Sequence, residues 1–431
     1  MGFESILILL LGLLGLFLII GFPIGFAILL SSVAVLFFKG LPLSMAMMKM
    51  IAGADSFLLT AIPFFILAGI LMRKGGITQR IIDFSLLLLG PVRGSLGHVN
   101  ILASMIFGGI SGSSVADTAS IGSILIPEMI RKKYPPSVSA AITSASSTIG
   151  IIIPPSIPMI LYAMASETSI GKLFLAGAIP GVMVGLFMMA ITAVISAKAG
   201  YGKERDKPAG LRELAKGVKD SILAITMPLI IIGGIVFGIV TATEAAVLAV
   251  AYAFVIGFFV YRELKLSDLP GALLETVQST AVVMLIVVAA SVLGWILAYE
   301  QLPQKVTVML LSVSNNPLVV LFIINAILLV VGTFSDVAPN ILILTPIFLP
   351  VIMRLGIDPV HFGIIVVANQ AIALVTPPVG NCLYICSNLA KVSIERLFRA
   401  AIPYLMSNLL VLILVTCFPQ MVMFLPNLLM K

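Results

Sequence analysis

The chain has 431 residues, of which 60% are hydrophobic and only 10% are charged. A soluble globular protein carries about 25% charged residues, so this composition cannot cover the surface of one or two soluble domains. It also excludes a disordered or collagen-like chain, because large aliphatic residues dominate and the 36 glycines follow no strict period. The long apolar runs exclude an outer-membrane barrel, whose strands alternate over short segments. The composition therefore predicts an integral membrane protein made of helices.

The net charge of +7 and the three cysteines have ordinary explanations in such a protein. Cytoplasmic loops of membrane proteins are enriched in Lys and Arg, so the basic balance does not indicate a nucleic-acid partner. Cys382, Cys386 and Cys417 lie in apolar segments. We interpret them as small buried hydrophobic residues rather than as a disulfide framework or a zinc site.

Ten apolar stretches are predicted to be transmembrane helices, since about 20 residues cross the hydrocarbon core of a bilayer. The run from residue 4 to 38 is too long for one span and is expected to break at Gly21-Phe22-Pro23, because proline interrupts a helix. In chain order the predicted spans cover residues 4–20, 22–38, 56–72, 137–165, 178–198, 222–240, 244–261, 276–299, 360–388 and 402–425.

Two further regions, residues 99–130 and 318–353, each hold two short apolar arms on either side of a small, polar patch. The patches cover residues 108–114 and 332–336. Arms of about 12–17 residues reach only part of the way across a bilayer. Both regions are therefore predicted to form re-entrant helical hairpins whose tips end inside the membrane.

The second half of the chain repeats the first at a constant offset. The same offset aligns Gly109 with Gly332 and the pair Pro154-Pro155 with Pro377-Pro378. Each half then holds five complete spans and one hairpin, and an odd number of spans places the second half upside down in the membrane. The sequence predicts an all-α polytopic membrane protein with an inverted-topology repeat. Its parts are a first repeat over 1–198, a cytoplasmic linker over 199–221 and a second repeat over 222–431.

Loop charges predict the orientation of this repeat. With the N-terminus outside, about three quarters of the basic residues fall on the cytoplasmic side, as the positive-inside rule requires. Both termini are then expected on the periplasmic side, and the two hairpins enter from opposite faces. The basic residues on the cytoplasmic side are Arg73, Lys74, Arg80, Arg93, Arg131, Lys132, Lys133, Lys198, Lys203, Arg205, Lys207, Arg212, Lys216, Lys219, Arg262, Lys265, Lys391, Arg396 and Arg399.

Four segments place irregular backbone at membrane depth: the two hairpin tips and the two spans that contain a Pro-Pro pair. A Pro-Pro pair removes two N–H donors from a helix. Such backbone is tolerated only where it is buried in protein or lines a cavity, because an unpaired polar group in hydrocarbon costs several kcal/mol. Broken segments at matching places of two inverted halves indicate the binding site of a transporter.

Most polar side chains of these segments carry an uncharged oxygen atom. Such oxygen ligands suit a hard, weakly charged ion such as Na⁺. Asp117 and Asp336 are the acidic residues nearest the tips, and a carboxylate within the membrane is by default a functional hypothesis. Asp117 has a helix N-cap as its alternative role, and the Ser-rich first tip has tight helix packing as its alternative. The neutral donors are Ser111, Ser113, Ser114, Ser147, Thr148, Thr333, Ser335, Asn369 and Thr376.

Other polar residues have structural interpretations. His98 and His361 lack the spacing of metal ligands and are expected at interfaces or caps, and Glu244 is expected to cap a helix together with Thr241. The sequence has no P-loop, so transport energy must come from an ion gradient or another subunit. No nucleophile, acid pair or metal set is apparent, so an enzyme is not expected.

Over essentially its whole length the chain resembles the large membrane subunit (the M subunit, DctM or SiaM type) of tripartite ATP-independent periplasmic (TRAP) transporters. The stretches that carry the resemblance are Phe107-Gly108-Gly109-Ile110-Ser111-Gly112-Ser113-Ser114-Val115-Ala116-Asp117, Ile153-Pro154-Pro155-Ser156, Gly332-Thr333-Phe334-Ser335-Asp336 with Pro339-Asn340, and Thr376-Pro377-Pro378-Val379-Gly380.

The resemblance implies an elevator-type, secondary active importer that moves an organic anion with Na⁺ across the bacterial inner membrane. The anion would be a C4-dicarboxylate, sialic acid or another sugar acid. A periplasmic substrate-binding protein (P type) would deliver it, and a small four-helix membrane subunit (Q type) would brace the large subunit within the lipid. The alternatives are a stand-alone carboxylate symporter coupled to Na⁺ or H⁺ and the permease of an ATP-driven importer.

The resemblance also implies two Na⁺ sites, each made by a hairpin tip and the adjoining broken span. Carried over to this sequence, the ion ligands are Ser111, Ser113, Ser147 and Gly150 in the first half and Gly332, Thr333, Thr376 and Gly380 in the second. The implied substrate-binding positions are Ser111, Ser114, Asp117, Pro154, Pro155, Ser335, Asp336, Asn340, Pro377, Pro378 and Asn381.

Overall fold

The computed structural model describes residues 3–430, and every regular element in that range is a helix. Within this described part of the chain, eight helices are long and apolar enough to cross a membrane, and several shorter apolar helices accompany them. Helices satisfy all their backbone hydrogen bonds internally, which is the condition for burial in lipid. The prediction of an all-α membrane protein is confirmed.

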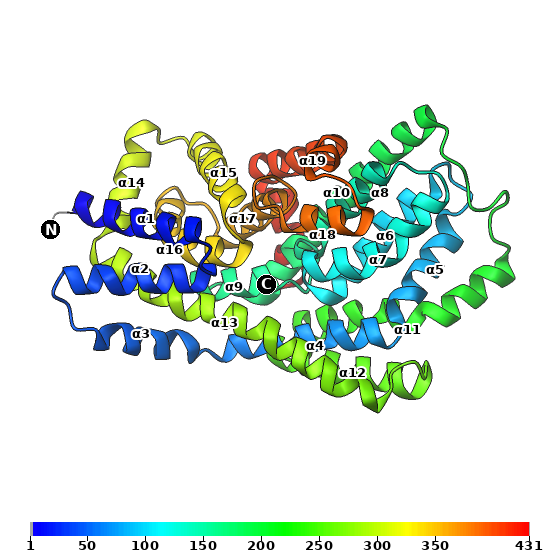
Figure 1. The fold of residues 1–431 in the computed structure, drawn as a ribbon, viewed down its shortest axis with the longest axis horizontal. Helices are drawn as coiled ribbons and strands as arrows, with labels where there is room; N and C mark the ends of the chain where they lie inside the picture. The colour runs from blue at the N-terminus through cyan, green and yellow to red at the C-terminus, as the bar shows by residue number, and fades with distance from the viewer. Residues whose placement is uncertain (1–2, 431) are drawn as a thin grey trace.

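One layer of helices, which we call the outer row, has α3, α4, α11, α12 and α13 along the lower part of the molecule in Figure 1, with α1 and α2 above its left end. Its long member α13 packs against α2, α3 and α4, and α12 packs against α4. Small residues permit this close packing: a Cβ on Gly25 would lie 2.8 Å from the Leu285 side chain. The row consists of α1 (Phe3–Ile20), α2 (Ile24–Phe38), α3 (Ser44–Ala54), the 3₁₀ turn η1 (Phe57–Thr60), α4 (Ala61–Lys74), α11 (Leu211–Val236), α12 (Ala242–Val255) and α13 (Leu269–Tyr299).

The second layer, which we call the hairpin group, contains the two predicted hairpins and the two interrupted spans. Hairpin 1 is made of α6 and α7, and hairpin 2 of α15 and α16. Each hairpin packs on the interrupted spans. The helix α7 contacts α8 and α18, and the helix α16 contacts α9 and α17. The group consists of α6 (Ser95–Ser111), α7 (Ser114–Arg131), α8 (Pro136–Ser146), η2 (Ser147–Ile151), α9 (Ile157–Ser166), α10 (Ile170–Ala199), α15 (Pro317–Phe334), α16 (Val337–Arg354), α17 (Pro359–Ala373), α18 (Asn381–Ala390), α19 (Ile394–Cys417) and α20 (Pro419–Leu429).

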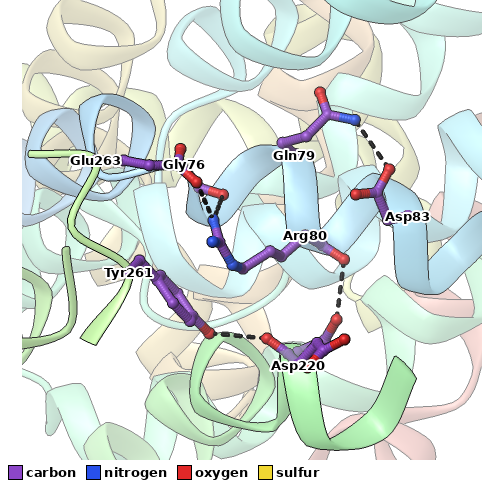
Figure 2. A network of polar contacts seen from close by, with 8 residues as sticks. Gly76, Gln79, Arg80, Asp83, Asp220, Tyr261 and Glu263 are labelled. Carbon is purple, nitrogen blue, oxygen red and sulfur yellow. Dashed lines mark hydrogen bonds and ion pairs between the residues drawn. The ribbon is translucent and has the colours of Figure 1, made fainter. Parts of the chain in front are cut away.

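Two arm helices, α5 (Ile77–Leu89) and α14 (Leu302–Val313), connect the layers. The first packs on α6 and α11, and the second on α16 and α13. At the start of α5, the Arg80 guanidinium pairs with Glu263 at 2.7 Å and lies 3.7 Å from the centre of the Tyr261 ring (Figure 2). These contacts fix the start of α5 against the segment that follows α12.

The helix pattern recurs at the offset seen in the sequence. The offset that aligns Gly109 with Gly332 also places both ends of α7 on the ends of α16, and the start of α8 on the start of α17. The halves differ in the outer row, where α3 and α4 are separated at Asp55-Ser56 while α13 is continuous.

Several predicted boundaries differ from the observed ones. The predicted span 178–198 is part of a 30-residue helix, α10, which begins at Ile170. The predicted span 402–425 is divided at Phe418 between α19 and α20. The helix α11 begins at Leu211, inside the predicted linker 199–221. The sequence-based spans also omit α3, α5 and α14, whose short apolar stretches do not reach the length of a membrane span.

The linker after α10 is packed on the base of hairpin 1. Tyr201 stacks on Tyr134 with ring centroids 4.3 Å apart, and Glu204 pairs with Lys132 at 2.8 Å. Burial, followed by the nearby Glu204 carboxylate, raises the pKa of Tyr134 to about 12, so this phenol is neutral at physiological pH. The start of the linker therefore belongs with the hairpin group, while α11 belongs with the outer row.

Candidate functional site

Both hairpin tips open onto one cavity of about 480 Å³ between the hairpin group and the outer row. This volume is within the usual range for small-molecule sites. From the hairpin group the cavity is lined by residues 111–116 of tip 1, by Asp336, Val337 and Ala338 of tip 2, and by Ile157, Pro158 and Leu161 of α9. From the outer row it is lined by Ile66, Gly69, Ile70 and Arg73 of α4 and by Glu275, Ser279, Val282 and Val283 of α13.

Tip 1 reverses the chain at Gly112, whose φ of +60° is readily accessible only to glycine. Ser113 then caps α7, since its hydroxyl accepts a 3.4 Å hydrogen bond from the Ala116 amide. Ser111 and Ser114 line the cavity on either side. The cavity therefore receives hydroxyl groups together with the amide-rich N-terminus of α7, which carries a partial positive charge.

Tip 1 packs directly on the first interrupted span. A Cβ on Gly108 would lie 2.7 Å from the Cα of Gly150, and one on Gly150 would lie 3.6 Å from the Ser113 carbonyl oxygen. The amide of Ile157, which follows the Pro-Pro pair, donates a 3.2 Å hydrogen bond to the Gly112 carbonyl. The Ser111 hydroxyl lies 3.4 Å from the Ser113 carbonyl. The structure thus brings together three ligands of the predicted first ion site, Ser111, Ser113 and Gly150.

Asp117 is fully buried one turn into α7. It is not the cap of that helix, a role that Ser113 fills, so the N-cap interpretation of Asp117 is wrong. The hydroxyls of Ser104 and Ser147 lie beside the carboxylate. Even so, neither of its oxygens has a hydrogen-bond partner of ordinary geometry among the described residues. Asp117 is absent from the cavity wall and lies behind tip 1, next to the fourth predicted ion ligand, Ser147.

Tip 2 is built differently. Asp336 caps α16 by accepting a 2.7 Å hydrogen bond from the Val337 amide, and the same carboxylate oxygen accepts a 3.2 Å bond from the Asn381 side chain. Asp336 also lines the cavity. The amide of Val379 donates a 3.1 Å bond to the Thr333 carbonyl, so this tip is likewise joined to the Pro-Pro segment that follows α17.

The predicted second set of ion ligands is also brought together. A Cβ on Gly332 would lie 2.8 Å from Ala373, and one on Gly380 would lie 3.1 Å from the Thr376 carbonyl. The φ of Gly380 is +40°. The Thr376 hydroxyl donates to the Ile372 carbonyl at 2.8 Å, which leaves its lone pairs available.

The remaining predicted substrate positions surround the tips without lining the cavity. Asn340 is buried, and its side-chain amide donates a 2.9 Å bond to Gln370, so it joins α16 to α17. Ser335 is half-buried in tip 2. The proline pairs, Pro154-Pro155 and Pro377-Pro378, each contain a cis peptide bond and lie next to the tips. Of the neutral donors, Asn369 bonds both to the backbone and to the side chain of Asn325, so it packs α17 against α15.

The sequence interpretation missed the outer-row wall of the cavity. Arg73 and Glu275 line it and form an ion pair between α4 and α13, with Ser279 one turn further along α13. The predicted spans 56–72 and 276–299 end one residue before Arg73 and begin one residue after Glu275. Arg73 and Glu275, the charged residues at the limits of these two predicted spans, therefore line the cavity. The Thr241–Glu244 cap of α12, by contrast, is confirmed as a reciprocal capping box.

A comparison with solved structures gives the fold. The chain aligns with the crystal structure of the Alcanivorax borkumensis YdaH transporter, described as having an unusual topology, at a TM-score of 0.62. The alignment covers 87% of each chain at 15% sequence identity. At this identity the likeness supports the architecture alone.

Comparisons of sequence give the family. The sialic acid TRAP transporter large permease protein SiaM of Vibrio cholerae is 43% identical over 409 residues, 95% of each chain. The C4-dicarboxylate TRAP transporter large permease protein DctM of Pseudomonas aeruginosa is 40% identical over 383 residues, 88% of each chain. The 2,3-diketo-L-gulonate TRAP transporter large permease protein YiaN of Escherichia coli is 36% identical over 94% of this chain. These relatives are transporter permease subunits, not enzymes.

The family model described as the DctM component of the tripartite ATP-independent periplasmic transporter matches residues 11–421. This match covers both halves of the chain, including both helical hairpins and the cavity between their tips. The chain therefore belongs to the DctM family, the large permease subunits of TRAP transporters.

Proposed function

We propose that this subunit imports an organic anion together with Na⁺, and that the anion binds in the cavity between the two hairpin tips. The observation that carries the proposal is the meeting of both tips, the N-terminus of α7 and α9 at one cavity of suitable size. Relatives are named for sialic acid, C4-dicarboxylate and 2,3-diketo-L-gulonate. All three are organic acids, and we propose this class for the substrate.

The charges around the cavity support cation coupling. Arg73 is the one cationic residue among the described residues of the wall, which also holds Glu275 and Asp336, and Asp117 is buried behind tip 1. With all three carboxylates ionised, this site repels an anion until cations bind. Two Na⁺ ions would offset the excess negative charge, so that binding of the ions would favour binding of the anion.

We propose that each Na⁺ binds where a hairpin tip meets the adjoining Pro-Pro segment. The first site would use Ser111, Ser113, Ser147 and Gly150, and the second Gly332, Thr333, Thr376 and Gly380. Hydroxyl and carbonyl oxygens suit a hard cation, and the unpartnered Asp117 carboxylate would supply negative charge near the first site.

We further propose an elevator mechanism, in which the hairpin group moves across the membrane against the outer row. Division of the helices into two layers joined by α5 and α14 supports this motion. A periplasmic binding protein would deliver the anion, and a small membrane subunit would hold the outer row. Two relatives, the permease proteins SiaT and DctMQ, are longer chains, and this chain aligns with about two thirds of each. The inner membrane, with both termini periplasmic, is the proposed location.

The coupling is tested by replacing Na⁺ with K⁺. The complex of this chain with its small subunit is reconstituted in liposomes, and uptake of radiolabelled sialic acid, succinate and 2,3-diketo-L-gulonate is measured with the binding protein present. Uptake is expected in Na⁺ and should be absent in K⁺, because K⁺ is too large for sites built for Na⁺. Uptake at the same rate in both salts would reject the coupling.

A stand-alone symporter coupled to H⁺ is the second candidate, and the buried, unpartnered Asp117 is the observation that favours it. It predicts uptake by this chain alone, driven by a pH gradient in Na⁺-free buffer. Absence of uptake until the small subunit and the binding protein are added would exclude it.

A further inference from the structure

The outer-row wall of the cavity carries an ion pair that the proposed function leaves unused. Arg73, in the last turn of α4, pairs with Glu275 of α13. Their side chains are 40% and 45% exposed. Arg73 is the one cation among the described residues of the cavity wall. The positive charge of this cavity therefore lies on the outer row, opposite the hairpins.

The position of Arg73 relative to tip 1 follows from the packing of α4. A Cβ on Gly69 would lie 3.5 Å from the Cα of Ser111, so α4 contacts tip 1 at this point. Arg73 is four residues further along, on the same face of the helix and about 6 Å along its axis. On α13, Glu275 and Ser279 share a face in the same way, and both line the cavity. The backbone of Arg73 is therefore about one helical turn from the point where α4 contacts tip 1, and its side chain lines the same cavity as Ser111 and Ser114.

We propose that Arg73 binds the anionic group of the substrate from the outer row, and that Glu275 competes with the substrate for the guanidinium. This inference rests on the proposed function of the cavity. The guanidinium presents its N–H donors as a planar fork that fits a carboxylate or a sulfonate. A half-exposed ion pair is worth about 1 kcal/mol or less, so an incoming anion can displace Glu275, and Glu275 can displace the anion again.

The arrangement gives Arg73 a defined place in the transport cycle. Arg73 and Glu275 belong to the outer row, whereas the proposed ion sites belong to the hairpin group. If the hairpin group moves, the substrate leaves Arg73 and keeps its contacts with the tips. Arg73 is then a contact of one end state only, and exchange between the substrate and Glu275 assists release in that state.

The two partners are tested by variants that should act in opposite directions. Binding of sodium N-acetylneuraminate, succinate, 2,3-diketo-L-gulonate and isethionate to the complex with the small subunit is measured by calorimetry in lipid nanodiscs. Arg73→Gln is expected to raise the Kd of the bound anion about tenfold, the loss typical of hydrogen bonds to a charged group. Glu275→Gln is expected to lower the Kd several-fold, because it removes the competitor. A purely structural ion pair would shift both Kd values in the same direction.

The Arg80–Glu263 pair (Figure 2) provides a matched control, since it joins α5 to the segment that follows α12. Neither residue lines the cavity. Arg80→Gln and Glu263→Gln should leave the Kd unchanged. An unchanged Kd in Arg73→Gln, or an equal rise in both cavity variants, would overturn the inference. If wild type binds the anion equally well in K⁺ and Na⁺, the proposed Na⁺ coupling is rejected. The opposite shifts in Kd expected for Arg73→Gln and Glu275→Gln would then still decide the inference about Arg73. Wild type that binds none of the four anions would overturn both.

Discussion

Individual glycines determine how closely the polar segments approach one another. Gly108 and Gly109 are neighbours in α6, yet their surroundings differ. A Cβ on Gly108 would meet the backbone of Gly150 at 2.7 Å, whereas the nearest atoms to a Cβ on Gly109 belong to Pro228 at 3.4 Å. Backbone cannot move aside as a flexible side chain can, so of these two glycines it is Gly108 that limits how closely tip 1 approaches the first interrupted span.

We therefore expect Gly108→Ala to separate tip 1 from the interrupted span and to impair Na⁺-dependent uptake. Overpacking typically costs about 1–3 kcal/mol, partly offset by the higher helix propensity of alanine. Gly109→Ala, with the same gain in propensity and an ordinary contact, should retain uptake. The measurements are the thermal midpoint of the purified complex and uptake in liposomes. Equal behaviour of the two variants would show that the Gly108–Gly150 contact does not matter.

At the scale of elements, each hairpin tip and its adjoining Pro-Pro segment form one unit. The amide of Ile157 bonds to the Gly112 carbonyl in the first half, and the amide of Val379 bonds to the Thr333 carbonyl in the second. These bonds use N–H groups just beyond the prolines, where no helical partner is available. The same solution thus occurs in both halves, although the two tips share little sequence.

If these units hold Na⁺, loss of one hydroxyl from either should weaken ion binding. Ser113→Ala and Thr376→Ala are expected to raise several-fold the Na⁺ concentration that gives half-maximal uptake. Ser113→Ala should also destabilise α7 by about 1 kcal/mol through loss of its cap. His98→Gln, about 20 Å along α6 from Ser111, is the control and should leave the Na⁺ dependence unchanged. Half-maximal concentrations that match wild type in both hydroxyl variants would argue against these ligands.

At the scale of the molecule, the orientation in the membrane is a prediction from loop charges. Lys203→Cys, in the exposed linker, should react with an impermeant maleimide only from the cytoplasmic side. Asn315→Cys, in the exposed turn between α14 and α15, should react only from the periplasmic side. The native cysteines are buried or half-buried, so wild type provides the background in labelled spheroplasts and inverted vesicles. Labelling of both positions from one side would contradict the inverted repeat.

The sequence by itself determined the membrane environment, the helical class, the repeat offset, both hairpins and both interruptions. These properties follow from local chemistry: apolar length, proline and clusters of small residues act within one segment, and each is visible there. The sequence also marked the polar tips, and Ser111, Ser114 and Asp336 do line the cavity.

Only the tertiary structure decided which residues from distant segments face one cavity. Arg73 and Glu275 are separated by about half the chain and appear in the sequence merely as the charged limits of two spans. They become partners because α4 and α13 pack side by side. Asp117, next to the tip in sequence, is instead buried behind it, one turn into the helix that Ser113 caps. Burial and pairing depend on packing between helices, and the pattern within one segment does not specify that packing.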